Sequence, residues 1–232
     1  MRVERVRGLD GARGARGAVV VIDVLRAFTT AAYACASGAR AIELVATPEE
    51  GLARKRVDPG LVLVGEVGGR PIPGFDHGNS PERMAALDLA GRRLVLRSSS
   101  GVQGALAALP TCETLLLASL VTARATVRVL AGLGRDVTLV PMGSPDGPDG
   151  PEDDACAEHL AALLDGAEPD PAPLLHRVRA SPAATQALDP ACDWISPGDL
   201  ELALALDRFP FALEARREAD ALVARRLDPE GG

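Results

Sequence analysis

Carboxylates, arginines and small hydroxyl residues stand at four places along the chain where they could carry chemistry. These places are Asp23 with Arg26, the stretch from Glu66 to Pro81, the turn from Ser98 to Gly101, and the run from Glu152 to Asp154. Three of them contain carboxylates, which repel one another in a shared pocket unless a cation lies between them. Hard oxygen ligands in small number suit Mg²⁺. A Mg²⁺ site would in turn suit a phosphorylated substrate.

The serine-rich turn is a candidate anion site because it falls where an expected strand enters an expected helix, so its N–H groups and hydroxyls could hold phosphate or sulfonate oxygens. Arg26 and Arg97 would add forked, charge-assisted contacts. Plainer interpretations stand beside these. A Ser-rich helix start is often only an N-cap, and the acids at Glu152–Asp154 also match a helix dipole. The residues of the turn are Ser98, Ser99, Ser100 and Gly101.

Alternating strands and helices are expected to position these groups. Short β-branched runs predict buried strands, and the Ala-rich or capped runs that follow them predict helices. In chain order these are a strand at 18–23, a helix ending at Gly38, a strand at 41–46, a helix opened by Thr47 and Pro48, and a strand at 61–66. Alternation of this kind predicts a parallel α/β sheet.

The same order of elements recurs about seventy-five residues further along the chain. Repeats covering about 18–70 and 92–143 place Asp23 over Ser98 and Glu66 over Met142. The alternative is a chance likeness, since any two βαβαβ stretches look alike. The predicted fold is a three-layer α/β/α arrangement with a largely parallel or mixed sheet and an internal duplication. Because ligands bind at the carboxyl ends of parallel strands, we expect the polar clusters to converge at one rim of this sheet.

One domain is expected to span residues 1–232, since 47% hydrophobic residues are ample for a core. Its C-terminal part, from about 152 to 228, is expected to be helical with Pro and Gly breaks. The clearest helix there begins at Ser196, Pro197 and Asp199.

Charge and cysteine usage narrow the function classes. The net charge of −7 and the scattered arginines argue against a nucleic-acid binder. No CxxC pair is present, so a zinc knuckle or dithiol site is disfavoured and reduced thiols are expected at Cys35, Cys112, Cys156 and Cys192. The charged N-terminus does not resemble a signal peptide, and the first apolar run is too short for a membrane span. We expect a cytoplasmic protein without membrane partners, and a homodimer is possible.

The sequence motifs of other phosphatase classes and of nucleotide-binding loops do not match the chain. The segment CASGAR, from Cys35 to Arg40, is one residue short of a Cys-x5-Arg cradle and falls at a helix end, so Cys35 is interpreted as a core thiol. The segment DVLRA, from Asp23, lacks the second Asp of an aspartyl-phosphate hydrolase. The sequence contains neither GxxxxGK[ST] nor GxGxxG.

Three stretches, in this order and spacing, resemble the ComB family of 2-phosphosulfolactate phosphatases. They are VVIDVLRAFTTA, GEVGGRPIPGFDHGNSPE and PEDDACA. The likeness runs from about Val19 to about Leu164 and more loosely to the C-terminal part, and GFDHGNSPE lies in its most specific stretch. The resemblance implies a Mg²⁺-dependent acid phosphatase that hydrolyses (2R)-O-phospho-3-sulfolactate to 3-sulfolactate and phosphate, a step of coenzyme M synthesis.

The resemblance also implies roles for single residues. It makes Asp23, Arg26 and Glu66 candidate catalytic residues, because they match the family's D-x-x-R-A and G-E elements. The candidate metal ligands are Asp23, Glu66, Glu152 and Asp153, of which the last two match the family's E-D pair. The candidate substrate contacts are Arg97, Ser98, Ser99, Ser100, Gly101, Asn79 and Ser80, of which the last two match the GNSP run.

One departure from the family concerns the anion turn. Relatives read a TTNGT-like sequence, whereas residues 98–102 read SSSGV, which keeps the hydroxyls and Gly101 but loses the Asn. Phosphate contacts from hydroxyl and backbone groups could survive this change, and another phosphorylated hydroxy acid could be the substrate. A relative that binds a small anion without turnover is the alternative from another class. The sequence also leaves open whether a carboxylate acts as base toward water or Asp23 attacks phosphorus directly.

Overall fold

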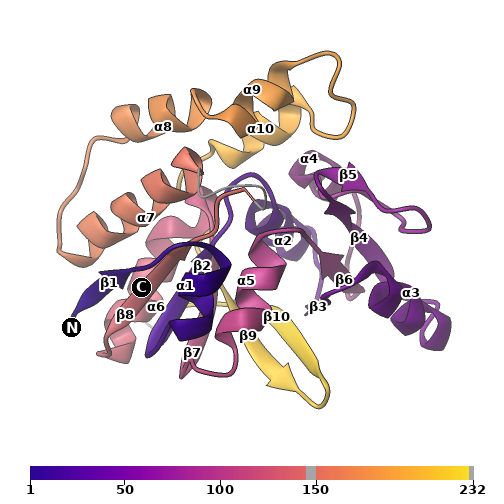
Figure 1. Cartoon of the computed structure of the whole chain (residues 1–232), viewed down its shortest axis with the longest axis horizontal. Helices are drawn as coiled ribbons and strands as arrows, with labels where there is room; N and C mark the ends of the chain where they lie inside the picture. The colour runs from indigo at the N-terminus through magenta and orange to yellow at the C-terminus, as the bar shows by residue number, and fades with distance from the viewer. Residues whose placement is uncertain (145–149, 230–232) are drawn as a thin grey trace.

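A computed structural model describes residues 1–144 and 150–229, and helices cover both faces of its mixed ten-stranded sheet (Figure 1). The strands are β1 (Val3–Arg5), β2 (Ala18–Ile22), β3 (Ala41–Leu44), β4 (Val62–Val67), β5 (Arg70–Pro71), β6 (Arg93–Arg97), β7 (Thr114–Ala118), β8 (Val137–Pro141), β9 (Ala212–Glu218) and β10 (Ala221–Leu227). The helices are α1 (Gly8–Gly14), α2 (Ala27–Ala36), α3 (Pro48–Val57), α4 (Pro81–Ala85), α5 (Gly101–Ala108), α6 (Ala123–Leu133) after the 3-10 turn η1 (Leu120–Thr122), α7 (Pro151–Leu164), α8 (Pro171–Arg179), α9 (Pro182–Leu188) and α10 (Pro197–Ala203). The predicted α/β/α fold is confirmed.

Several helices begin where the sequence offers a hydroxyl cap followed by proline. The cap side chain accepts a hydrogen bond from the backbone N–H three residues on, and proline suits the first helical position because it has no N–H to satisfy. The predicted start at Ser196 is confirmed, and its helix carries a full capping box with Asp199. The capped starts of this type are Thr47 for α3, Ser80 for α4, Ser181 for α9 and Ser196 for α10.

The order of strands in the sheet is symmetric about its centre. The order is β1-β8-β2-β7-β9-β10-β3-β6-β4-β5. Strand β2 lies between β7 and β8, and β6 lies between β3 and β4, with parallel pairing in both blocks. Each proposed repeat therefore contributes its first strand to the block built by the other repeat. Two copies of one βαβαβ unit that exchange their first strands would give this order.

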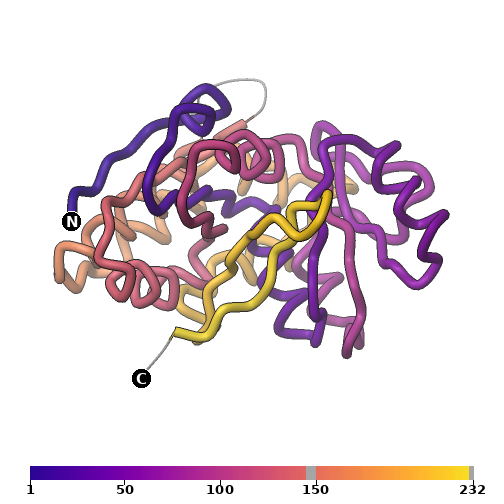
Figure 2. The backbone as a smooth tube through the Cα atoms, turned by 90° about the horizontal axis from the view of Figure 1, so that it is seen from below, coloured from indigo at the N-terminus to yellow at the C-terminus, as the bar shows by residue number. Residues whose placement is uncertain are grey.

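The prediction that the C-terminal part is helical is wrong for its last segment. Residues Ala212–Leu227 form the antiparallel hairpin β9–β10, which joins the two blocks by pairing with β7 on one side and β3 on the other (Figure 2). Ala, Leu, Arg and Glu favour helices when packing does not decide. Here Leu213 and Ala215 point into the core while Arg216 is exposed, so tertiary pairing overrides the helical propensity.

Two helical layers cover the sheet. On one face α1, α2, α4 and α5 pack over alternate residues such as Val21, Leu96 and Leu117. On the other face α6 and α7 cover residues such as Val20 and Leu116, and α3 covers a smaller cluster around Val95. Helices α8 to α10 arch across the top of Figure 1 and end beside α4. None of the helices in the described ranges is long and apolar enough to cross a membrane.

The two parallel blocks run in opposite senses along the ladder, because β7, β9, β10 and β3 are joined by three antiparallel pairings. The polar strand ends therefore do not lie on one rim of a parallel sheet, and the prediction that they do is wrong. A twist of roughly 20–25° per neighbouring strand adds up to roughly 100–125° over the five steps from β2 to β6. This turns the blocks so that the N-terminal ends of α2 and α5 meet, where the N–H of Gly101 donates to Asp23 at 2.9 Å.

Candidate functional site

A small polar cavity of about 210 Å³ lies where the ends of β2, β4 and β6 meet. Seven of the residues singled out in the sequence line it: Asp23, Arg26, Glu66, Asn79, Ser99, Ser100 and Glu152. The rest of its wall comes from Leu25, Gly68, Gly69, Gly143, Ser144, Pro182, Ala183 and Gln186. Groups far apart in the sequence thus share one cleft, and α9 covers one side of it.

Asp23 is held by the N-termini of α2 and α5. Its Oδ1 accepts from the N–H of Ala27 at 2.9 Å, and its Oδ2 accepts from the N–H of Gly101 at 2.9 Å. A Cβ on Gly101 would lie 2.5 Å from that second oxygen, so only glycine fits there. Burial, with the charge of Glu66 adding to it, raises the pKa of Asp23 to about 6.

Glu66 joins the end of β4 to the serine turn. Its Oε1 accepts from the N–H of Ser99 at 2.5 Å, and its Oε2 accepts from the Ser99 hydroxyl at 3.0 Å and from the N–H of Gly69 at 2.7 Å. Residues Gly68 and Gly69 both have positive φ, which lets the chain turn tightly between β4 and β5. Glu66 is therefore fixed in place by three donors.

The acids at the start of α7 differ in their surroundings. Asp153 is buried and accepts from the N–H of Val24 at 2.8 Å and of Gly143 at 2.9 Å, so it braces the backbone behind Asp23. Glu152 lines the cavity, and its buried Oε2 has no hydrogen-bond partner within the described residues. Burial and the nearby charge of Asp23 raise the pKa of both carboxyls.

Arg26 is the buried cation of the site, and its position depends on a residue that the sequence analysis did not assign to the site. Its guanidinium donates to the carbonyls of Trp194 and Gly69 and to Asp199 at 3.3 Å. Asp199 is 1% exposed and also accepts from the Ser80 hydroxyl at 2.6 Å. One carboxylate therefore ties α10, the start of α4 and Arg26 together. Only the tertiary structure reveals this role, since in the sequence Asp199 signals no more than a helix start.

Four of the predicted substrate contacts lie outside the cavity wall. Arg97 donates to the carbonyl of Glu66 and to the Ser99 hydroxyl, and Ser98 is 1% exposed, with its hydroxyl accepting from the N–H of Val102 in the first turn of α5. Ser80 caps α4, and the N–H of Gly101 is taken by Asp23. The turn therefore uses two of its N–H groups, those of Ser99 and Gly101, to hold carboxylates.

The long irregular segment after β4 is tied back to the strand it leaves. Asp76 accepts from the N–H of Leu63 at 2.7 Å and pairs with Lys55, and the N–H of Gly65 donates to the carbonyl of His77. This return brings Asn79 to the cavity wall, where its side chain is 4% exposed. Its Oδ1 has no hydrogen-bond partner within the described residues.

The donor set suits a cation that needs few protein ligands. Within residues 1–144 and 150–229, no group of three His, Cys, Asp or Glu side chains forms a ready metal cluster. Mg²⁺ in proteins keeps several waters and takes only one or two carboxylates beside substrate phosphate oxygens. Burial and the charge of Asp23 raise the pKa of Glu152, and its buried Oε2 has no hydrogen-bond partner within the described residues. The residues present therefore fit Mg²⁺ better than a metal that demands a closed shell of side chains.

Comparison with known proteins identifies the family. The family described as 2-phosphosulpholactate phosphatase matches residues 6–190. A protein of Bacillus subtilis named probable 2-phosphosulfolactate phosphatase is 35% identical over 171 residues, which is 73% of this chain and 74% of the relative. Proteins with the same name from Deinococcus radiodurans and Carboxydothermus hydrogenoformans are each 41% identical, over 63% of this chain and 62% and 60% of their own lengths. The chain therefore belongs to the 2-phosphosulpholactate phosphatase family.

Proposed function

We propose that this enzyme, a phosphoric monoester hydrolase by its family, hydrolyses 2-phosphosulfolactate to sulfolactate and phosphate in the Asp23 cavity. The observation that carries the proposal is the meeting of Asp23, Glu152 and Arg26 in one cleft of about 210 Å³. This volume is below the range of drug-sized pockets and suits a compact, highly charged substrate. The names of the relatives supply the substrate.

Mg²⁺ is the proposed cofactor, and Asp23 and Glu152 are its proposed ligands. When bound, the ion would polarise a phosphoryl oxygen and neutralise the charge that develops on it. Asp23 can take this part because two backbone N–H groups fix its orientation and each oxygen keeps a further lone pair. Asp153 and Glu66 are proposed to act behind it, holding the loops at Gly143 and Ser99.

The remaining groups are proposed to orient the substrate and its water. Arg26 presents a fixed positive charge to the phosphoryl or sulfonate oxygens, and Ser100 and Asn79 offer polar atoms on the wall. Glu152 lines the cavity with a buried Oε2 that has no hydrogen-bond partner among the described residues, so this oxygen can bind the ion. We favour attack by water over direct attack by Asp23, because the proposal uses the remaining lone pairs of Asp23 to bind the metal ion.

Phosphate release tests the proposal. Purified protein is given 2-phosphosulfolactate, phospholactate and a generic aryl phosphate, each with Mg²⁺ and with a chelator. We expect release to be fastest from 2-phosphosulfolactate and to stop with the chelator. Alanine at Asp23 or Glu66 should abolish release while the fold persists. Saturable binding of every ester without turnover would instead favour a small-anion binding protein, and release unaffected by the chelator would refute the role of the metal.

Three wider expectations belong to the same proposal. Free thiols at all four cysteines, with no disulfide among the described residues, support a cytoplasmic location. A step of coenzyme M biosynthesis is the proposed pathway. The homodimer stays a prediction, which sedimentation of the purified protein would test.

A further inference from the structure

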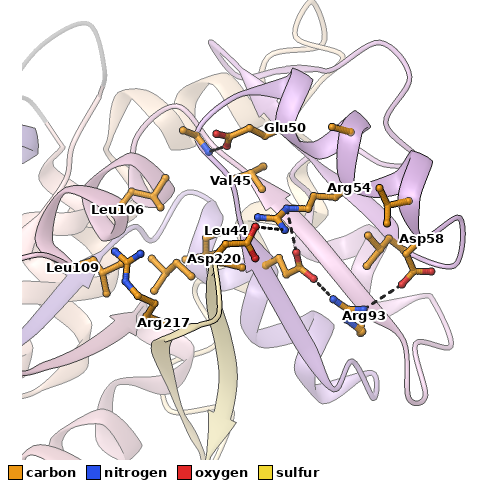
Figure 3. A pocket seen from close by; sticks show the side chains of 17 residues that line it. Leu44, Val45, Glu50, Arg54, Asp58, Arg93, Leu106, Leu109, Arg217 and Asp220 are labelled. Atoms are coloured by element: carbon orange, nitrogen blue, oxygen red, sulfur yellow. Dashed lines mark hydrogen bonds and ion pairs between the residues drawn. The ribbon is translucent and has the colours of Figure 1, made fainter.

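A second cavity, of about 540 Å³, lies between α3, α5 and the tip of the β9–β10 hairpin (Figure 3). It shares no lining residue with the Asp23 cavity. Its volume falls within the range of small-molecule sites. Its two ends differ in chemistry, which decides what it could bind.

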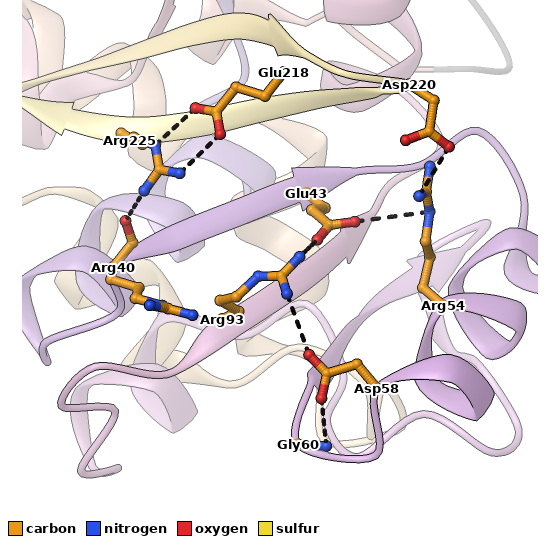
Figure 4. A network of polar contacts seen from close by, with 9 residues as sticks. All are labelled: Arg40, Glu43, Arg54, Asp58, Gly60, Arg93, Glu218, Asp220 and Arg225. Carbon is orange, nitrogen blue, oxygen red and sulfur yellow. Dashed lines mark hydrogen bonds and ion pairs between the residues drawn. The ribbon is translucent and has the colours of Figure 1, made fainter.

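One end is closed by ion pairs that satisfy one another. Buried Glu43 pairs with Arg93 and with Arg54 at 3.7 Å, and these arginines also reach Asp58 and Asp220 at 3.2 Å each (Figure 4). Both cations therefore have carboxylate partners. This end has little charge left for a ligand.

The other end combines an apolar surface with a free cation. Leu44 and Leu222 come from the sheet and are each 3% exposed, while Leu106 of α5 and Leu109, the residue that ends this helix, are half-buried. Arg217 lies at this end in Figure 3, and it makes no hydrogen bond or ion pair with any residue in the described ranges. A positive charge beside an apolar wall is thus left without a counter-ion.

The symmetry of the sheet identifies the counterpart of this place in the other half. Leu44 pairs with Leu222 across β3 and β10, as Leu117 pairs with Leu213 across β7 and β9. Counting along the two strands of the hairpin, Arg217 then corresponds to Arg226. The two arginines occupy equivalent positions at opposite ends of the hairpin.

At the Arg226 end, the chain fills the space with its own aromatic rings. The guanidinium of Arg226 lies over the ring of Phe211, with Cζ 4.6 Å from the ring centroid. Phe209 stacks on Phe211 at 5.2 Å, and Tyr33 of α2 meets Phe209 edge to face at 4.9 Å. The segment that leads into β9 supplies both phenylalanines.

At the Arg217 end, residues 1–144 and 150–229 contain no such segment. Strand β10 follows β9 after two residues, so no chain leads in from outside, and the repeat offset of seventy-five residues places Ala108 where α2 has Tyr33. The cavity is therefore the space that aromatic side chains occupy in the other half.

We propose that the Arg217 end of this cavity binds a small molecule consisting of a planar aromatic ring that carries an acidic group. The ring would lie against Leu106 and Leu109 beneath the guanidinium, as Phe211 lies beneath Arg226. The acidic group would supply the counter-ion that Arg217 lacks. This inference does not depend on the proposed phosphatase reaction.

A ligand-observed NMR titration that measures binding of 2-naphthoate to the protein of residues 1–232 tests the inference. A dissociation constant of about 1 mM is expected for a ligand of this size. Two probes remove one feature each: 2-naphthalenemethanol lacks the acid and cyclohexanecarboxylate lacks the aromatic ring. Both are expected to bind at least about fivefold more weakly, the scale of one exposed cation–π or ion-pair contact.

Substitutions locate the site. Arg217→Met should weaken the binding of 2-naphthoate by about fivefold or more. Leu109→Trp should abolish binding, because the indole ring would fill the space that the ligand needs. Arg128→Met is the matched control, because Arg128 is an exposed arginine of α6 that likewise has no partner among the described residues. Unchanged affinity in Arg217→Met, equal binding of all three probes, or no saturable binding to the native protein would overturn the proposal. Because Arg217 is exposed, its variant keeps the test valid even if Leu109→Trp does not fold.

Discussion

At the scale of single residues, the candidate site depends on a buried carboxylate whose ionisation is costly. Asp23 is 5% exposed, and burial raises its pKa from 3.8 to about 6. An acid with a raised pKa in the folded state stabilises the fold while it is protonated. This contribution is fully present below the unfolded pKa and is lost as the pH rises through the folded one.

The variant Asp23→Asn tests this in metal-free protein. We expect the stability advantage of the native chain over the variant to shrink by roughly 2–3 kcal/mol between pH 4 and pH 7, because a shift of about two units is worth this much. Urea unfolding of both proteins with a chelator, at several pH values, measures the difference. A difference that stays constant with pH would mean that Asp23 is not the titrating group.

Gly101 offers a second test at this scale. A methyl group there would lie 2.5 Å from the Asp23 Oδ2 and must displace that carboxylate. Gly101→Ala should therefore lower kcat/KM by about a hundredfold, since small misplacements of catalytic groups cost this much. The matched control is Gly132→Ala in α6, where an added Cβ meets nothing within 4 Å. Phosphate release by the two variants is compared. Equal activity in both would show that the position of Asp23 does not affect the reaction.

At the scale of elements, Asp199 connects parts that come from distant regions of the chain. Its side chain accepts from the N–H of Ser196 in the capping box of α10, accepts from the N–H of Glu82 at the start of α4, and pairs with Arg26. Removing it leaves a buried arginine without its carboxylate. The consequence should appear both in stability and in the site.

We expect Asp199→Ala to lose about 3–5 kcal/mol of unfolding free energy, the cost of breaking a buried ion pair, and to raise KM as Arg26 becomes mobile. Asp170→Ala is the control, because Asp170 caps α8 at an exposed start and its loss should cost only about 1 kcal/mol. Urea unfolding and steady-state kinetics measure the two effects. Equal losses in the two variants would argue against the bracing role of Asp199.

The sequence predicted individual elements better than their pairing. Periodicity and caps predicted β2, α2, β3, α3 and β4 and their later counterparts, because these signals are local. The exchange of β2 and β6 between blocks and the hairpin at 212–227 were not predicted, because they follow from long-range pairing. Likewise, motifs indicated Asp23, Glu66 and Glu152, whereas Asp199 acts only through contacts made by the folded chain.

At the scale of the whole molecule, the hairpin holds the two halves in one sheet. It lies between β7 and β3, and Leu213, Ala215, Leu222 and Ala224 are buried in the shared core. Without it, both blocks would present an unpaired strand edge. The site would lose its geometry as well, since Asp23 belongs to one block and the turn at Ser99 follows a strand of the other. The sequence predicts that residues 1–232 form a single domain, and removal of the hairpin also tests this prediction.

A chain that ends at Pro210 should therefore lose cooperative unfolding and phosphate release together. Denaturant titration followed by circular dichroism, beside the full chain as control, measures the first. A truncated protein that still unfolds in one sharp transition and turns over substrate would contradict the role of the hairpin.

The central claim is that Asp23 and Glu152, brought together from two distant parts of the chain, share one Mg²⁺ in the polar cavity. Calorimetric titration of Mg²⁺ into the native protein and into Asp23→Asn and Glu152→Gln tests it directly. One Mg²⁺ site per chain is expected in the native protein, and each variant is expected to lose at least about tenfold in affinity, about 1.4 kcal/mol. Native affinity in both variants, or no Mg²⁺ binding to the native protein with or without phosphate, would contradict it.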